Sequence, residues 1–200
     1  MRARTAIAVV LSLTLAVPAL AQQQVSRVRG SIAAIDATSM TVAARDGNQV
    51  KLGLTPETGV AAVKALDLQS IQPGSYIGTA AKPGADGGLE AIEVVVFPEA
   101  ARGTGEGQFP WDLVPGSSMT NGTVNGVVEG AKGRNLDVMF KGQKASITVP
   151  PSAPVVTFGP AERADLKPGL PVFVTARPGA DGAMTAARIV VGKDGVAPPM

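Results

Sequence analysis

Residues 83–87 read Pro-Gly-Ala-Asp-Gly, and residues 178–182 repeat the same five amino acids 95 positions later. The segments just upstream match at the same spacing, because Ile71-Gln72-Pro73-Gly74 corresponds to Leu166-Lys167-Pro168-Gly169. The two copies therefore share both a Pro-Gly turn and an Asp-Gly turn in the same order.

The match extends to both ends of the copies. Downstream, Val94–Val96 corresponds to Ile189–Val191 at the same spacing. Near the start, Val28-Arg29-Gly30 matches Val124-Asn125-Gly126 at a spacing of 96, so we infer that one residue was gained or lost in between. A repeat of this length indicates a duplicated domain, because the units of solenoid proteins are only about 20–50 residues long.

The N-terminus has the pattern of an export signal. Arg2 and Arg4 supply positive charge, Ala6–Val17 is apolar, and Ala19-Leu20-Ala21 is a small-x-small cleavage pattern before Gln22. A membrane anchor is the alternative, but it needs about 20 apolar residues, which this run lacks. We expect cleavage after Ala21 and a soluble mature chain that is periplasmic or secreted, with no membrane span after cleavage.

Composition excludes several function classes. Removal of Arg2 and Arg4 from the 18 Lys and Arg leaves 16, against 16 Asp and Glu, so the mature chain has no basic excess for binding nucleic acid. The sequence contains neither Cys nor His. Disulfides, the usual structural zinc sites and imidazole-assisted nucleophiles are therefore excluded, and we expect no cofactor.

Period-two alternation of apolar residues, broken by turns, predicts five strands in each copy. In the first copy the expected strands are Val28–Ile32, Met40–Ala44, Val50–Leu54, Ser75–Ala81 and Leu89–Phe97. In the second copy they are Val124–Val128, Leu136–Phe140, Ala145–Val149, Val172–Ala176 and Met184–Val191. The less regular stretches 59–72 and 161–166 are each expected to hold at most one short helix.

The fold class expected from this order is all-β. Three strands, an irregular connection and two strands fit a small, partly open barrel of the oligonucleotide/oligosaccharide-binding (OB-like) kind, while a sandwich fits the spacing as well. We therefore expect two tandem five-stranded lobes from an internal duplication. The expected boundaries are a signal peptide at 1–21, β lobe 1 at 22–97, an ordered connector at 98–123, β lobe 2 at 124–192 and a C-terminal tail at 193–200.

The connector has no counterpart in either copy and contains Trp111, the single tryptophan of the chain. A flexible linker would be rich in Gly and Ser and would lack Phe109, Trp111 and Leu113, so an ordered loop is expected. Trp111 and Phe109 are interpreted either as apolar residues that fill the seam between the lobes or as a surface on which a ligand stacks.

Charged residues of the connector allow two interpretations. Glu99, Glu106 and Asp112 are close in sequence and could supply oxygen ligands to a divalent cation, although no calcium-loop motif is present. Alternatively, Arg102 pairs with one of these carboxylates and fixes the loop. The Gly-rich run at 103–107 lacks the Gly-Lys-Ser/Thr ending of a phosphate-binding loop.

The chain resembles a family of exported, uncharacterised bacterial proteins with tandem β domains. The resemblance is carried by Val28–Ile32, by Ile71–Gly74, by Asp86–Ala91 and their second-copy versions, and by the connector segments Phe97–Gly107 and Pro110-Trp111-Asp112. Some members of that family carry a metal-transporter label. The resemblance implies an exported β protein, and it leaves the ligand open.

The function expected from these observations is that of a non-enzymatic binding or structural module. It would bind a protein or an envelope glycan across the connector and the seam between the lobes, through Arg102, Glu106, Phe109 and Trp111. The alternative is a periplasmic accessory protein for divalent metal delivery or transport, with Glu99, Glu106 and Asp112 as the metal ligands.

Overall fold

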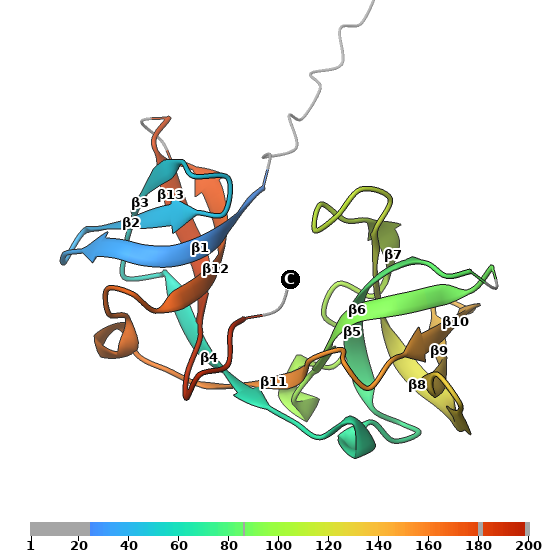
Figure 1. Cartoon of the computed structure of the whole chain (residues 1–200). Coiled ribbons are helices and arrows are strands. Elements are labelled where there is room, and N and C mark those ends of the chain that lie inside the picture. Colours follow the sequence, from blue (N-terminus) through green and yellow to red (C-terminus); the bar gives the residue numbers. More distant parts are fainter. Residues whose placement is uncertain (1–24, 86, 180–181, 199–200) are drawn as a thin grey trace, which may run out of the picture.

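The computed structural model describes residues 25–85, 87–179 and 182–198 (Figure 1). The expected signal peptide therefore lies outside the described residues. The strands are β1 Ser26–Ile35, β2 Ser39–Ala44, β3 Gln49–Gly53, β4 Gly59–Ala65, β5 Tyr76–Pro83, β6 Leu89–Val96, β7 Gly107–Pro110, β8 Ser118–Gly130, β9 Gly133–Phe140, β10 Gln143–Val149, β11 Val155–Pro160, β12 Pro171–Pro178 and β13 Met184–Val191. Three short 3-10 turns complete the list: η1 Leu68–Ser70, η2 Glu99–Ala101 and η3 Arg163–Asp165.

The all-β prediction is confirmed, and each of the ten expected strands overlaps an observed one. Two further strands lie where none was expected: β4 lies in the less regular stretch 59–72, and β11 lies between the expected strand Ala145–Val149 and the expected helix at 161–166. Each of these strands is hydrogen-bonded to a neighbour on both edges, and successive residues such as Ala62 and Val63 are both buried. Because both faces of the strand are covered, the sequence shows no regular alternation of apolar and polar residues. Where one short helix was expected in each copy, the structure has only the 3-10 turns η1 and η3.

Strands β5, β6, β10, β9 and β8 are hydrogen-bonded in this cyclic order and close a five-stranded barrel, here called the β8 lobe. The ring closes where β6 and β10 run parallel, with Leu89 opposite Ile147. Side chains alternate as a barrel requires: along β9, Leu136, Val138 and Phe140 are buried and the residues between them are half-exposed.

Strands β1, β2, β3, β13 and β12 follow one another in the same cyclic order and are here called the β1 lobe. This ring closes at one pair, Gly53 opposite Thr185. Its interior is apolar, with Ile32, Met40 and Val42 almost completely buried. The two lobes thus use the same strand order around separate cores.

The lobes do not follow the expected boundaries of 22–97 and 124–192. The β8 lobe runs without a break from β5 to β10, and the β1 lobe combines β1–β3 with β12 and β13 from the other end of the chain. Three strands of the β1 lobe come from the first repeat and two from the second, while the β8 lobe has the reverse composition. After β3 the chain leaves the β1 lobe through β4, which pairs with β13 and with β11; β11 in turn pairs with β6 (Figure 1). These two crossing strands join both lobes into one continuous sheet.

Repeat-related positions have the same local geometry. The β5–β6 ladder has an irregularity between Ala80 and Ala81, and the β12–β13 ladder has one between Thr175 and Ala176, 95 residues later. In the β4–β11 ladder Val63 faces its own repeat partner, residue 158. The crossing strands β4 and β11 therefore pair with each other at equivalent positions of the two sequence repeats.

The correspondence between β1 and β8 differs from the one expected from sequence. The β1–β2 ladder is irregular between Ile32 and Ala34, and the β8–β9 ladder between Val124 and Gly126, so β1 and β8 correspond at a spacing of 92. The match of Val28-Arg29-Gly30 with Val124-Asn125-Gly126, at a spacing of 96, is wrong by four residues. Gly30 corresponds to Gly122.

This correspondence has a steric cause. A Cβ atom on Gly30 would overlap the main-chain carbonyl of Ala43 on β2, and a Cβ atom on Gly122 would overlap that of Met139 on β9. In both lobes the first strand crosses its neighbour at a distance that only glycine allows.

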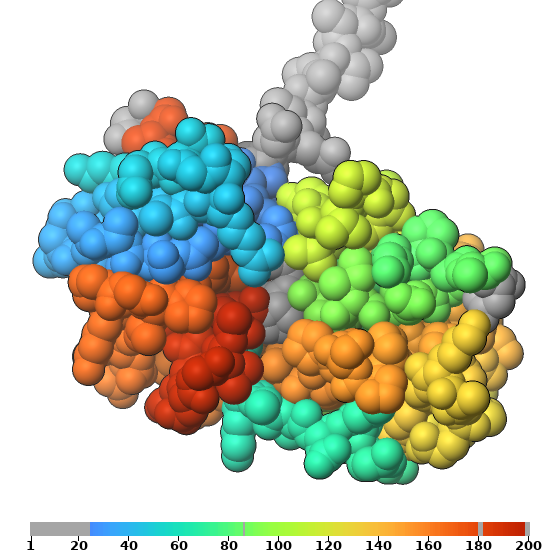
Figure 2. Space-filling view, in the orientation of Figure 1, coloured from blue at the N-terminus to red at the C-terminus, as the bar shows by residue number. Residues whose placement is uncertain are grey.

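A third group of buried residues fills the seam between the lobes. Val63, Val95, Val156, Phe173 and Val190 form this cluster, and it draws on β4, β6, β11, β12 and β13. Trp111, Phe158 and Val196 are partly buried against it. Figure 2 shows the two lobes packed side by side, with the connector reaching the β1 lobe at the top of the seam.

We predict that Gly30→Ala lowers the free energy of unfolding by about 1–3 kcal/mol, because main-chain atoms of β2 must move to admit the methyl group. Gly159→Ala on β11 is the matched control, since nothing lies within 4 Å of its would-be Cβ. The measurement is the midpoint of urea unfolding. Equal midpoints for the two variants would contradict the close approach of β1 to β2.

Candidate functional site

The connector is ordered and passes from one lobe to the other. Within it, β7 pairs antiparallel with the first residues of β8, so that 118–123, which were expected in the connector, belong to β8. Beyond β7 the chain forms a tight loop from Trp111 to Ser117. The main-chain N–H of Trp111 donates to the Ser117 carbonyl at 2.8 Å.

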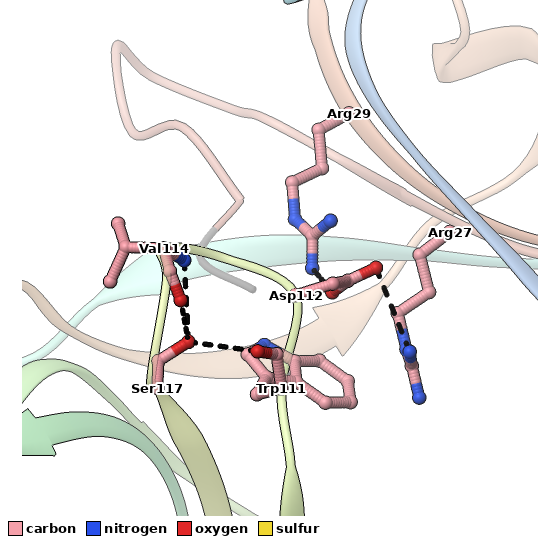
Figure 3. A network of polar contacts seen from close by, with 6 residues as sticks. All are labelled: Arg27, Arg29, Trp111, Asp112, Val114 and Ser117. Atoms are coloured by element: carbon pink, nitrogen blue, oxygen red, sulfur yellow. Dashed lines mark hydrogen bonds and ion pairs between the residues drawn. The ribbon is translucent and has the colours of Figure 1, made fainter.

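Ser117 holds this loop closed (Figure 3). Its buried hydroxyl donates to the Val114 carbonyl at 2.7 Å and lies 3.0 Å from the Trp111 carbonyl. The same oxygen accepts a hydrogen bond from the Val114 N–H at 3.2 Å. Gly116 has a φ of 75°, which the reversal of the chain requires. The loop therefore presents Trp111 and Asp112 to the β1 lobe in a defined position.

Trp111 joins the seam to two arginines of β1. The Arg27 guanidinium carbon lies 3.9 Å from the centre of the indole ring, and that of Arg29 lies 5.8 Å away. The ring of Phe109 contacts Trp111 edge-on at 5.9 Å. A guanidinium over an indole face is attracted by about 0.5–2 kcal/mol, depending on its exposure to water. The cation–π contact holds the Arg27 guanidinium against the connector.

Asp112 binds the same two arginines through its carboxylate (Figure 3). Arg29 Nη2 donates to Asp112 Oδ1 at 2.8 Å, and Arg27 Nη1 lies 3.7 Å from Oδ2. Partial burial opposes ionisation of Asp112, but the hydrogen bond from Arg29 and the charges of both arginines outweigh it and lower the pKa of the carboxyl group. The side chain of Asp112 nevertheless remains 50% exposed, whereas that of Arg29 is 11% exposed.

An open cleft of about 350 Å³ lies beside these residues, between the connector and the end of the β2–β3 hairpin. It is lined by Arg27, Val28, Arg29, Ala44, Arg45, Asp46, Val50, Asp112 and Leu113. The lining thus contains three arginines and two aspartates, and one of these, Asp46, accepts hydrogen bonds from the main chain and side chain of Asn48. The cleft is cationic and is made by both the connector and the β1 lobe.

The site residues expected from sequence separate into two places. Trp111, Phe109 and Asp112 lie at or next to the cleft, whereas Arg102 and Glu106 contact the β8 lobe. Arg102 donates two hydrogen bonds to Glu99, at 2.6 and 2.7 Å, and one to the Gly74 carbonyl at 3.0 Å. The two hydrogen bonds from Arg102 to Glu99 lower the pKa of the Glu99 carboxyl group.

Glu106 accepts a hydrogen bond from the main-chain N–H of Lys141 at 2.7 Å. The three carboxylates considered as metal ligands, Glu99, Glu106 and Asp112, therefore each bind a different group. Among residues 25–85, 87–179 and 182–198, no three acidic side chains gather in a way that could hold a metal ion.

Sequence reasoning missed the arginines that line the cleft. Arg27 and Arg29 alternate with the inward-facing Val28 on β1, so both point to the outer face, and this period-two spacing was a usable signal. At the corresponding positions of β8, 92 residues later, the chain has Met119 and Asn121, which are uncharged. The cationic cleft therefore belongs to one lobe only.

Comparison with family models, with curated proteins and with solved structures gave no match for this chain. In the part of the chain that the structure describes, no helix has the length and apolar character needed to cross a membrane.

We predict that acidification releases the connector from the β1 lobe. The pKa of Asp112 lies below its usual value of 3.8 in the folded protein. Its stabilising contribution is therefore complete above pH 3.8 and is lost as the pH falls through the folded-state value. The emission spectrum of Trp111, followed from pH 6 downward, should shift in this range.

Asp112→Asn should remove this shift and give the acid-form spectrum at neutral pH. Glu99→Gln is the matched control, because Glu99 also has a lowered pKa but binds Arg102. An acid shift that persists unchanged in Asp112→Asn would show that another group controls the position of Trp111.

Proposed function

We propose that this protein is an exported, non-enzymatic binding module that holds an anionic ligand in the cleft between the connector and the β1 lobe. The observation that carries the proposal is the set of three arginines, Arg27, Arg29 and Arg45, around an open cleft beside Trp111. The expected ligand classes are a protein and an envelope glycan, and in either case carboxylate or phosphate groups would be the parts recognised.

Guanidinium groups suit this role because their planar fork binds carboxylates and phosphates through two parallel hydrogen bonds. Arg27 is held over the indole ring of Trp111, so little freedom is lost when an anion binds. Arg45 is exposed and forms no ion pair with any other residue that the structure describes, which leaves its charge for a ligand.

Asp112 acts in this proposal as an internal substitute for the ligand. Its carboxylate occupies the hydrogen-bonding positions of Arg29 that an incoming anion would use. Since half of its side chain is exposed, it can turn out of the cleft without disturbing a core. A ligand with two or more negative groups would bring several anionic contacts to the arginines in place of the single Asp112 carboxylate, and would therefore displace Asp112.

Other features support binding rather than catalysis. The sequence has no His or Cys, and the connector carboxylates are each engaged by a cation or a main-chain N–H. The same engagement disfavours the alternative of divalent metal delivery through Glu99, Glu106 and Asp112. Metal delivery would need these side chains to leave three separate partners and converge.

Export and origin belong to the same proposal. The signal pattern ending at Ala21 supports release into the periplasm or the medium, and the resemblance to exported tandem β proteins agrees with it. The shared strand order and matched registers of the two lobes support an internal duplication of an OB-like unit. In that view the scaffold was duplicated first, and the arginines of β1 arose in one copy.

The test is a titration of the purified protein followed by Trp111 fluorescence, with poly-L-glutamate and polygalacturonate as anionic probes and dextran as a neutral one. Both anionic probes should shift the emission, and dextran should not. Arg27→Gln and Arg45→Gln should each weaken binding about tenfold, the value of one charge-assisted hydrogen bond.

Arg177→Gln is the matched control, because Arg177 is an exposed arginine on β12 that does not line the cleft. Absence of binding to either anionic probe, with the protein folded, would overturn the proposed function. If Arg177→Gln weakened binding of the anionic probes as much as Arg27→Gln does, the binding would depend on the overall charge of the protein and not on the cleft.

A further inference from the structure

The first half of β8 has a strand on each side. β5 pairs with it on one edge, and on the other edge β7 pairs with it, with Gly107 opposite Asn121 and Phe109 opposite Met119. The corresponding half of β1 has β12 on one edge, from Ser26 onward. On its other edge β2 pairs only from Gly30, and no strand of the described residues takes the place that β7 has on β8.

The main-chain groups of Arg27 point to this open edge. The Arg29 carbonyl accepts a hydrogen bond from the Arg45 N–H at 3.0 Å, which shows that Arg29 faces the β2 side of the strand. Because main-chain direction alternates along an antiparallel strand, Arg27 faces the same side, two residues beyond this last hydrogen bond between β1 and the β2 side. The 350 Å³ cleft lies along this edge, since Arg27, Val28 and Arg29 all line it.

We propose that an extended acidic peptide binds here by adding a strand antiparallel to β1, as β7 adds to β8. This inference rests on the proposed function and names the ligand class of the same cleft. A peptide supplies the alternating N–H and C=O groups that match the edge of a strand, whereas a glycan does not. The molecule itself shows such a pairing on the repeat-related edge.

The register of β7 on β8 fixes the pattern of the peptide. Transferred by the spacing of 92, it places one peptide residue opposite Arg29, where it would displace the Arg45 N–H from the Arg29 carbonyl, the next opposite Val28 and the third opposite Arg27. In an antiparallel pair, directly opposite side chains share a face. The first and third peptide residues would therefore meet the arginines, and the middle one would lie on the side of Val28 and Val50.

The recognised sequence is consequently acidic–apolar–acidic. Its two carboxylates would bind Arg27 and Arg29 and replace Asp112, and Arg45 would attract the chain at the end of the cleft. Charged side chains beside an open edge can also serve only to prevent aggregation through that edge. The experiment below distinguishes this role from peptide binding.

The probe is an acetylated and amidated heptapeptide, Thr-Thr-Glu-Val-Glu-Thr-Thr, titrated into the full protein and followed by Trp111 fluorescence. Two variants of this peptide carry one N-methyl group. Methylation of the second Glu removes the N–H that faces Arg27, while methylation of Val removes one that points away from β1. The first should weaken binding about tenfold or more and the second much less, because only the first removes a cross-strand hydrogen bond.

A second readout uses amide hydrogen exchange. The Arg27 N–H should exchange more slowly, by about tenfold, when the peptide is bound, because it then donates to the peptide main chain. Polygalacturonate should leave this rate unchanged. Together the N-methyl pair and the Arg27 exchange rate report strand addition rather than attraction of charge.

Three outcomes would overturn the inference. Equal affinities of the two methylated peptides, with polygalacturonate competing for the cleft, would leave the proposed function intact and remove strand addition. Anionic polymers that bind while the peptide does not, with Arg27→Gln aggregating, would give the arginines an edge-protecting role. A dimer in sedimentation that excludes the peptide would make a second copy the occupant of the edge. Failure of every anionic probe would overturn the proposed function as well.

Discussion

The exchange of strands between repeats is the constraint on which the rest of the structure depends. Each lobe needs five strands, and each repeat supplies three to one lobe and two to the other. The β8 lobe is closed by the continuous run β5–β10, whereas the β1 lobe is complete only because β4 and β11 carry the chain away and back, so that β12 and β13 lie beside β1–β3. The seam cluster around Val63 and Val156 is a third group of buried residues, and it lies on the crossing strands that join the β1 lobe to the β8 lobe.

This arrangement also determines where the two halves can differ. Positions that close the barrels are matched, as Gly30 and Gly122 show, because a side chain at either would enter the neighbouring strand. The outer edges of β1 and β8 are free of that requirement. On β8 the edge is covered by β7, whose neighbour Glu106 binds the Lys141 N–H; on β1 the edge lies beside arginines and an open cleft.

The connector ties the differing edges to each other. Its β7 segment belongs to the β8 lobe, and within two residues the chain places Trp111 and Asp112 against β1. Trp111 has two roles at once, since one part of it contributes to the seam and its ring face carries Arg27. A ligand that displaces Asp112 would thus act on a residue that also contacts the core between the lobes.

Local pattern was enough to predict the strands and the turns, because alternation and Asp-Gly or Pro-Gly pairs act over a few residues. The ten expected strands are present, and the connector is ordered. The pairing partners of those strands were not predictable from the sequence. The apolar face of β12, for example, could pack beside a strand from either repeat. The sequence match of Val28 with Val124, at a spacing of 96, was wrong because it ignored strand pairing. The irregularities in the β1–β2 and β8–β9 ladders show that Ile32 corresponds to Val124.

The residues of the candidate site also fall into those that the sequence singled out and those that only the tertiary structure revealed. The sequence alone singled out Trp111, Phe109 and Asp112, because a tryptophan and a carboxylate in a segment without a repeat counterpart are conspicuous. It did not place Arg27 and Arg29 beside them, because about eighty residues and six intervening strands, β2 to β7, separate the two segments in the chain. It also grouped Arg102 and Glu106 with Trp111 by proximity in sequence, whereas the hairpin of β7 and β8 holds both against the β8 lobe. Periodicity decides which face a side chain takes, but only the crossing of the chain between lobes decides what that face meets.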